Sequence, residues 1–221
     1  MVLLVPAGSL PAQSATEYPE DIAARIQLKY DRMTSLSFTF NQESRGQMSG
    51  RPRVGSGTAY FFKNEKTSRM RWNYNSPDQQ VLISDGKTFS MYFADLHQMI
   101  VTPAKNLDND LTYTFFSGKG QIADKFHILP PDPEYIQEQV MDGQPIALKL
   151  VPKEAQSQVQ SIHLWVSDDS LIQRIEIRDQ FDTITLLNLS AIKVDTLTAE
   201  RVKEQGLFSF TPPEGTEIIQ Q

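Results

Sequence analysis

The 221-residue sequence contains no cysteine, which excludes disulfide bonds and thiolate chemistry but says little about the compartment. Histidine is scarce, and the 3 histidines show no metal-ligand spacing; a Gly-x-Ser-x-Gly elbow is also missing. No apolar run approaches the roughly 18 residues of a membrane-spanning helix. Lys plus Arg number 21 against 27 Asp plus Glu, and the formal net charge of −6 disfavours a nucleic-acid partner. We therefore predict no catalytic site, no metal and no cofactor.

The first 15 residues, MVLLVPAGSLPAQSA, contain no charged residue, begin apolar and end in small residues. This pattern is typical of the later part of a secretory signal, with cleavage near Ala12, Ser14 or Ala15. The basic region that opens such a signal is missing, so the alternatives are a start placed too far downstream and an unstructured tail. We expect a truncated signal segment at 1–15 and a single domain at 16–221.

One strong amphipathic helix is predicted over Pro19–Met33. Ile22, Ile26, Tyr30 and Met33 recur at spacings of four, four and three, which places them on one apolar stripe. The proline at the start suits the first helical turn. Beyond this helix the apolar period changes to two, which is typical of strands.

Predicted strands, separated by turns, cover most of the remaining chain. They lie at 35–42, 58–62, 69–74, 81–83, 89–92, 98–102, 146–151, 159–166, 171–178, 183–189 and 207–210. Asp85 and Gly86 predict a type I′ hairpin, which needs positive φ values. Weak helices are expected at 107–122 and 198–203. The proline-rich stretch 129–144 is expected to be irregular or to form an excursion from the sheet.

These strands carry more apolar surface than one strong helix and two weak ones can cover. A sheet must bury its apolar face, and two architectures would do so. One is a two-layer sandwich in which every aromatic residue is core, and composition slightly favours it. The other is a curved sheet whose concave face is partly covered by helices and encloses an apolar cavity. Composition and periodicity leave both open.

Several segments resemble the periplasmic outer-membrane lipoprotein carrier family, LolA. In chain order, the matching pieces are Leu36–Gln42 (LSFTFNQ), Gly57, Arg71 with Trp72, Pro77, Val81–Lys87 (VLISDGK), Tyr92, Gln98 and Phe208–Gly215 (FSFTPPEG). The two longest motifs are fairly specific when they occur in this order. The similarity spans roughly Pro19 to Ile219, which is nearly the whole chain.

The resemblance implies a mainly β (α+β) fold, an incomplete antiparallel β-barrel with a helical lid over an apolar cavity. It implies a monomeric periplasmic carrier that accepts acylated lipoproteins from an inner-membrane ABC exporter. Delivery would be to the outer membrane, where a lipoprotein receptor is a further expected partner. By strand parity and the helix stripe, the expected lipid-binding residues are Met33, Phe38, Phe40, Phe61, Met70, Trp72, Leu82, Phe89 and Met91.

The sequence departs from the family pattern at two places. The family's Arg-Pro pair, whose arginine bonds the lid closed, corresponds here to Lys63-Asn64. Lysine lacks the planar fork of arginine, so Lys63 and Arg69 are both lid-latch candidates. A family turn of the form Asp-x-x-Gly-Gln appears here as Asp179–Asp182, without the glycine.

Two rival functions belong to other classes. LolA-like folds also occur in envelope-stress sensors that bind an anti-sigma factor; these carry an additional C-terminal domain, for which we expect no counterpart here. The other rival is an acyl hydrolase, which ester turnover abolished by a Ser or His substitution would support. The lipoprotein carrier is the leading hypothesis.

Overall fold

The computed structural model of the protein describes residues 17–46, 51–64, 67–109, 113–114, 116, 120–136, 145–154 and 159–221. The predicted signal segment at 1–15 lies outside these residues. The helices are α1 (Pro19–Arg32), the 3-10 helix η1 (Ala104–Asn109), α3 (Ile122–Lys125), α4 (Pro133–Ile136) and α5 (Ala199–Glu204). The strands are β1 (Ser35–Arg45), β2 (Arg53–Lys63), β3 (Ser68–Ser76), β4 (Gln80–Ser84), β5 (Thr88–Phe93), β6 (Gln98–Pro103), β7 (Phe126–Leu129), β8 (Ile146–Pro152), β9 (Ser161–Val166), β10 (Ile172–Arg178), β11 (Ile184–Val194) and β12 (Glu217–Gln220).

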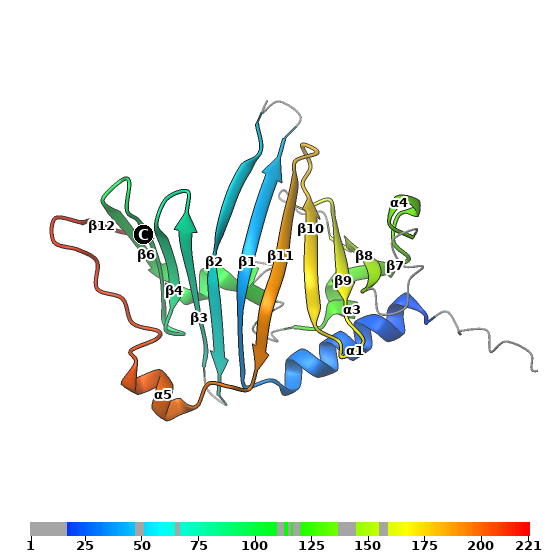
Figure 1. The fold of residues 1–221 in the computed structure, drawn as a ribbon, viewed down its shortest axis with the longest axis horizontal. Coiled ribbons are helices and arrows are strands. Elements are labelled where there is room, and N and C mark those ends of the chain that lie inside the picture. The colour runs from blue at the N-terminus through cyan, green and yellow to red at the C-terminus, as the bar shows by residue number, and fades with distance from the viewer. Residues whose placement is uncertain are drawn as a thin grey trace, which may run out of the picture.

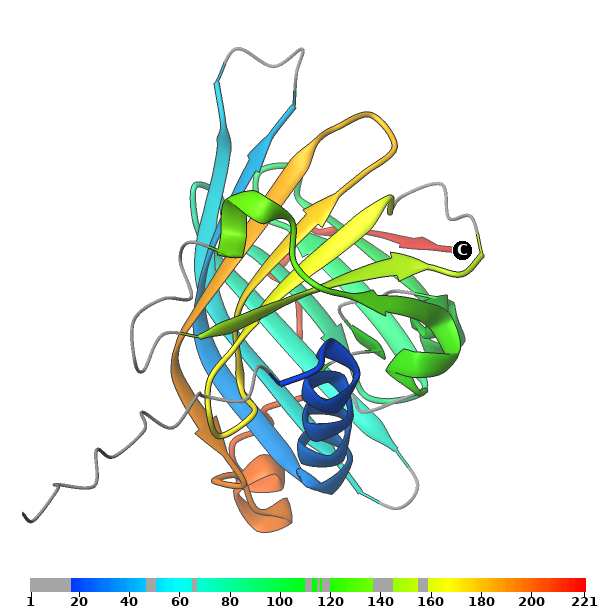
Figure 2. The ribbon, with the colours of Figure 1, turned by 90° about the vertical axis from the view of Figure 1, so that its right-hand side faces the viewer.

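All of these strands belong to one 12-stranded sheet, in the order β12-β6-β5-β4-β3-β2-β1-β11-β10-β9-β8-β7. Neighbouring strands are antiparallel except β12, which pairs with β6 in parallel. The sheet is open, because β12 and β7 form its two ends, and it curves strongly, with α1 across its concave side (Figures 1 and 2). The structure therefore confirms the incomplete barrel with helices and rules out the two-layer sandwich.

The helix predicted at Pro19–Met33 is confirmed as α1. Proline stands in its first turn together with Glu20 and Asp21, whose carboxylates complement the positive end of the helix dipole. Ile22, Ile26 and Tyr30 are buried, so the apolar stripe faces the sheet. These side chains belong to the largest buried cluster, which also contains the aromatic residues of β1–β3.

Strand register places Phe38, Phe61 and Trp72 on the concave face of the sheet. Phe38 pairs with Ala59 and Ala59 with Trp72, and the same row continues through Leu82 to Met91 across β3, β4 and β5. The rings of Phe38 and Trp72 lie 5.5 Å apart in an edge-to-face arrangement. Alternation had predicted this parity correctly.

The turn between β4 and β5 differs from the prediction. It is a three-residue loop in which Gly86 alone has a positive φ, of 94°, so the predicted type I′ hairpin is wrong. The Asp85 carboxylate accepts hydrogen bonds from the N–H groups of Lys87 and Thr88, both at 2.8 Å. The Asp85 side chain thus stabilises a loop with one positive φ, whereas a type I′ turn would need two.

The strand predicted at 207–210 is also wrong. The backbone carbonyls of Leu207 and Ser209 accept hydrogen bonds from Nη1 of Arg71, at 3.0 and 3.3 Å. Phe208 packs on Phe62, on the convex face of the sheet. Strands β7 and β12, which were not predicted, form the two edges instead.

The remaining sequence predictions have mixed outcomes. Every other predicted strand overlaps an observed one, and the weak helix at 198–203 is confirmed as α5, with Thr198 as its N-cap. The stretch predicted as a weak helix at 107–122 holds the end of η1 and helical residues at 113–114 and 116; positions 110–112, 115 and 117–119 lie outside the described residues.

Gly57 lies in β2 at the point where the register with β3 shifts. A Cβ atom added there would lie 1.8 Å from the carbonyl oxygen of Asn73, which forces the two strands apart. We therefore expect Gly57→Ala to lower the free energy of unfolding by about 1–3 kcal/mol. Urea denaturation measures this change.

Gly55→Ala is the matched control in the same strand. Its added Cβ would first meet side-chain atoms of Tyr74 at 3.3 Å, and a ring can shift more cheaply than backbone. Equal urea midpoints for the two variants would contradict the proposed close approach at Gly57.

Candidate lipid-binding cavity

An apolar cavity of about 300 Å³ lies on the concave face of the sheet. One wall comes from β3, β4 and β5 and the opposite wall from β10 and β11, so segments far apart in sequence face each other across it. The lining residues are Gln42, Met70, Trp72, Tyr74, Leu82, Phe89, Met91, Leu107, Tyr113, Ile175, Ile177, Thr185 and Leu187. Most of this surface is aliphatic or aromatic, which suits an apolar ligand.

The structure brings most of the predicted site residues together. Met70, Trp72, Leu82, Phe89 and Met91 line the cavity directly. Met33, Phe38, Phe40 and Phe61 do not line it, but they belong to the same buried cluster. The opposite wall, with Ile175, Ile177 and Leu187, was not predicted, because strand parity alone does not show which distant strands face each other.

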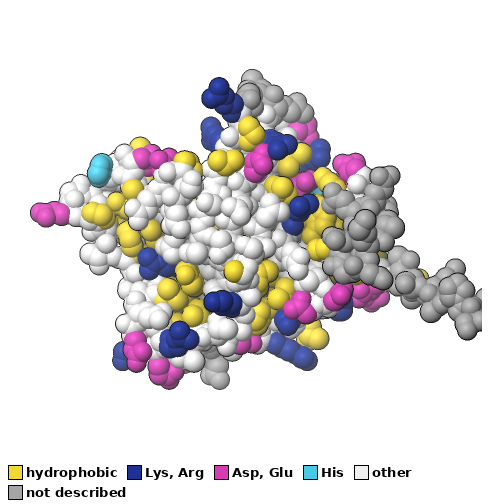
Figure 3. Space-filling view, in the orientation of Figure 1, with side chains coloured by type: hydrophobic (Ala, Val, Ile, Leu, Met, Phe, Trp, Pro, Cys, Tyr) yellow, Lys and Arg dark blue, Asp and Glu magenta, His cyan; other side chains and the backbone are white. Residues whose placement is uncertain are grey.

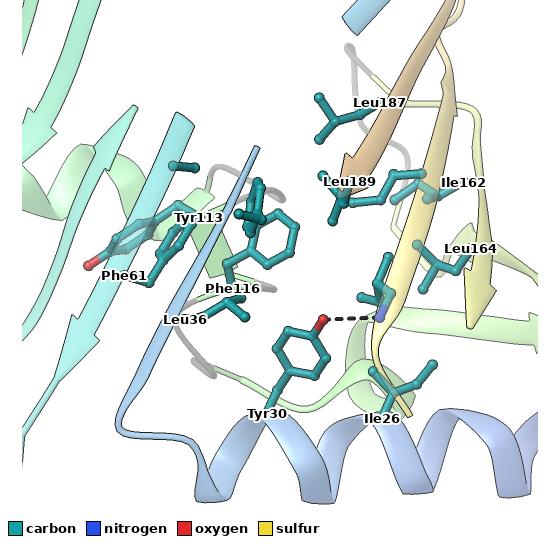
Figure 4. Close-up of a cluster of buried hydrophobic side chains, with 14 of the residues drawn as sticks. Ile26, Tyr30, Leu36, Phe61, Tyr113, Phe116, Ile162, Leu164, Leu187 and Leu189 are labelled. Atoms are coloured by element: carbon teal, nitrogen blue, oxygen red, sulfur yellow. Dashed lines mark hydrogen bonds between the residues drawn. The ribbon is translucent and has the colours of Figure 1, made fainter. Parts of the chain in front are cut away.

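Phe116 fills the space next to the cavity and was also missed by the sequence prediction. Its ring centroid lies 5.0 Å from that of Phe38 and 5.1 Å from that of Phe61. It also lies 6.2 Å from the rings of Trp72 and Tyr30. Figure 4 shows Phe116 and Tyr113 beside Phe61, with the side chains of β9 and β11 opposite. The helical spacing of apolar residues at 107–122 was the available signal.

Polar groups on the cavity wall lie toward one end of the strands. The Tyr74 hydroxyl donates to Oε1 of Gln42 at 2.9 Å. Thr185 follows the first residue of β11 and shares a 2.9 Å hydrogen bond with Ser44. These groups mark the end of the cavity nearest the β1–β2 and β10–β11 turns.

Within the described residues, three polar contacts attach α1 to the ends of surrounding strands. The Tyr30 hydroxyl accepts a hydrogen bond from the buried N–H of Ile172, at 3.2 Å (Figure 4). Burial raises the pKa of the Tyr30 phenol well above its ordinary value. Arg25 donates to the Ser170 hydroxyl at 2.7 Å and pairs with Glu17. The third contact comes from Lys63.

Lys63 lies at the C-terminal end of α1. Its Nζ donates to the backbone carbonyls of Tyr30 and Asp31, at 2.7 and 2.8 Å, where helix carbonyls lack intrahelical partners. Burial lowers the pKa of the Lys63 ammonium, and the nearby carboxylates of Asp31 and Asp195 oppose this shift. Among the described residues, Nε of the other latch candidate, Arg69, is buried without a hydrogen-bond partner.

Asp195, at the end of β11, fixes the junction between α1 and β1. Its carboxylate accepts from the N–H groups of Thr34 and Ser35, at 2.7 and 3.1 Å, and from the Thr34 hydroxyl at 2.9 Å. Burial alone would raise the pKa of Asp195, but these hydrogen bonds hold it below its ordinary value. The helix therefore leaves the sheet in a defined direction.

Within the described part of the chain, no three His, Asp or Glu side chains are grouped to hold a metal ion, and no helix is long and apolar enough to cross a membrane. Buried His163 lies on the convex face, with Nε2 3.2 Å from Asp132 and Nδ1 3.7 Å from Glu176. Burial lowers its pKa, although both carboxylates act against the shift.

The open curved sheet, the apolar cavity and the covering helices define the class of incomplete β-barrels with an apolar cavity on the concave face. The family model described as outer membrane lipoprotein carrier protein LolA matches residues 31–211. The chain belongs to this family.

Two relatives agree with this assignment, and a solved structure shares the fold. The outer-membrane lipoprotein carrier protein of Nitrosomonas europaea is 30% identical over 168 residues, which cover 76% of this chain and 73% of the relative. The outer-membrane lipoprotein carrier protein of Alkalilimnicola ehrlichii is 29% identical over 204 residues, which cover 91% of this chain and 86% of the relative. An uncharacterized conserved protein from Thermus thermophilus shares the fold, with a TM-score of 0.50 at 13% identity, over 91% of this chain and 98% of that one.

The packing of Phe116 predicts a large stability effect. Phe116→Ala removes a buried ring from the aromatic cluster, so we expect the free energy of unfolding to fall by about 3–5 kcal/mol. Phe181→Ala is the control, because that ring is 80% exposed, and we expect a change within about 0.5 kcal/mol. Chemical denaturation compares the two, and a small effect at Phe116 would show that its segment does not pack in solution as it does in the structure.

The contacts of Lys63 predict a local effect on α1. Lys63→Met removes both hydrogen bonds to the helix carbonyls, which costs about 1–3 kcal/mol and favours opening of the helix. We expect faster amide hydrogen exchange over Pro19–Arg32 in this variant. Lys63→Arg keeps a donor in place and should retain most of the protection, and Lys87→Met changes an exposed lysine elsewhere as a control. Unchanged exchange in Lys63→Met would contradict the contact.

Proposed function

We propose that the protein is a periplasmic carrier of lipoproteins. The cavity takes up acyl chains of lipoproteins released at the inner membrane by an ABC exporter, and the protein delivers them to the outer membrane, where a receptor is the expected acceptor. The observation that carries this proposal is an apolar cavity inside an open sheet, covered by helical segments with few polar attachments. Membership of the LolA family supports it.

The energetics of an acyl chain explain why such a carrier needs an enclosed site. Each methylene exposed to water costs about 0.8 kcal/mol, so a chain of about 15 methylenes costs about 12 kcal/mol. The cavity wall offers Met70 and Met91 beside aromatic rings. Methionine side chains are flexible and polarisable, and they adapt to chains of different length.

The cavity must enlarge to hold several acyl chains. Its volume of about 300 Å³ lies at the lower end of the range for ligand pockets, roughly 300–1,000 Å³. Phe116 fills the adjoining space between Phe38 and Phe61. We infer that displacement of Phe116, with movement of α1, adds Met33, Phe38, Phe40 and Phe61 to the lipid-binding wall.

The same arrangement keeps the affinity for lipid moderate. Phe116 and the acyl chains compete for the same aromatic surface. Displacing the Phe116 ring costs free energy, which lowers the net free energy of lipid binding. Moderate affinity favours transfer to a tighter acceptor. In this scheme Lys63 is the lid latch, because it joins β2 to the end of α1.

Binding of a fluorescent triacylated lipopeptide to the purified protein tests the cavity. Met91→Lys places an ammonium group in the apolar wall, and we expect the affinity to fall roughly 100-fold. Leu96→Lys introduces the same charge at an exposed leucine outside the cavity and should bind as the wild type does. Equal affinities for the two variants would place the lipid elsewhere.

Release of lipoproteins from spheroplasts tests the carrier activity itself. We expect the purified protein to release a lipoprotein from the inner membrane and to hold it in a one-to-one complex that stays in solution. Met91→Lys should release little, whereas Leu96→Lys should match the wild type. If the wild type binds the lipopeptide but releases no lipoprotein, the carrier function is wrong although the cavity binds lipid.

A further inference from the structure

Five exposed side chains gather around the end of the sheet at which the cavity has its polar groups. Phe181 and Val54 are 80% and 60% exposed, and the three arginines beside them are also exposed. We name this surface the hairpin rim; it consists of Arg45, Arg51, Arg53, Val54 and Phe181.

Strand pairing brings the members of the hairpin rim together. Arg45, the last residue of β1, pairs with Ile184, the first residue of β11, three positions after Phe181. Arg53 and Val54, at the start of β2, pair with Ser44 and Glu43. Figure 3 shows basic, apolar and some acidic side chains over this projecting end of the molecule.

The turn that carries Phe181 holds the ring away from the core. The Asp179 carboxylate accepts hydrogen bonds from the N–H groups of Phe181 and Thr183, both at 2.8 Å. Asp182 has a φ of 57°, in the left-handed region, at the place of the glycine in the family's turn. The hydrogen-bonded turn therefore leaves this aromatic ring accessible to a partner at this end of the sheet.

The charges of this end have different partners. Glu43 pairs with Arg45, and Asp182 lies 4.0 Å from Arg178. The Asp179 carboxylate is directed at its own turn. Arg51 and Arg53 add positive charge to the hairpin, in a chain whose formal net charge is −6. The end of the β1–β2 hairpin therefore carries a positive formal charge, opposite in sign to the net charge of the whole chain.

We propose that the hairpin rim docks on a bilayer surface that carries anionic phospholipid headgroups. Arginines pair with lipid phosphates, and an aromatic ring among them enters the interfacial layer. Gln42 and Thr185 of the cavity wall lie directly below the rim in β1 and β11, so docking points the polar end of the cavity at the membrane. The proposal rests on the carrier function, since it names the surface at which acyl chains enter or leave.

Flotation of the full-length protein with lipid vesicles tests the docking. We use vesicles of phosphatidylcholine and of phosphatidylcholine mixed with phosphatidylglycerol. The wild type should bind the mixed vesicles much better, and salt should weaken the binding. Each arginine near an anionic surface contributes about fivefold, so the triple variant Arg45→Gln, Arg51→Gln, Arg53→Gln should bind on the order of 100-fold less.

Single variants separate the apolar part of the docking from the charge. Phe181→Ser should reduce vesicle binding about tenfold, because an aromatic side chain no longer leaves water. Leu96→Ser is the matched control, since Leu96 is 58% exposed but lies in the β5–β6 turn, outside the rim. Phe181→Trp reports the insertion by a blue shift of its emission with mixed vesicles.

The outcomes distinguish the docking from the carrier function. All rim variants should bind the lipopeptide in solution as the wild type does. Equal binding of the wild type to both kinds of vesicle, or unchanged binding of the triple variant, overturns the docking and leaves the cavity proposal intact. If the wild type binds the mixed vesicles through the rim but binds no lipopeptide, membrane docking is supported and the carrier function is contradicted.

Discussion

The concave face of the sheet is the constraint on which the rest of the structure depends. One curved sheet presents aromatic and aliphatic side chains from most of its strands toward a single interior, with few helical residues to cover them. Burying that interior completely would give an ordinary core, and leaving it open would expose a large apolar surface to water. The protein does neither: Phe116 and the apolar stripe of α1 pack into this interior, and a cavity remains beside them.

The attachments of α1 suit a cover that must move. Its buried face includes Ile22, Ala23 and Ile26, and apolar contacts of this kind have no preferred direction. Among the described residues, the directional contacts of α1 lie in its middle and at its C-terminal end. Arg25 donates to Ser170 and Gln27 accepts from the N–H of Ile122, while Lys63 donates to carbonyls of the last turn. A helix held in this way can tilt while Asp195 keeps its junction with β1 in place.

Sequence predicted local features better than long-range ones. The period of α1 and the alternation of β1 and β3 predicted the correct faces, because the apolar side chains of each element lie on its buried side. Strand β7 was missed because four residues beside prolines carry too short a pattern. The strand at 207–210 was predicted wrongly, because Phe208 and Phe210 alternate also when they lie on the outside of a sheet.

The candidate site shows the same limit. Residues of β3–β5 on the cavity wall could be predicted, since their register follows from short hairpins. Ile175 and Leu187 form the opposite wall only because the whole sheet curves far enough to bring them there. The periodicity of a single segment does not predict this curvature. Phe116 is a similar case: its spacing indicates a helix, but its partners Phe38 and Phe61 lie far away in the chain.

The two ends of the open sheet have a further consequence. A closed barrel has no edges, whereas this one has two strands whose outer backbone groups could pair with another molecule. Each edge strand has only four residues, Phe126–Leu129 and Glu217–Gln220, so the template for such pairing is short. Edges this short let the barrel stay incomplete with little risk of strand-to-strand aggregation.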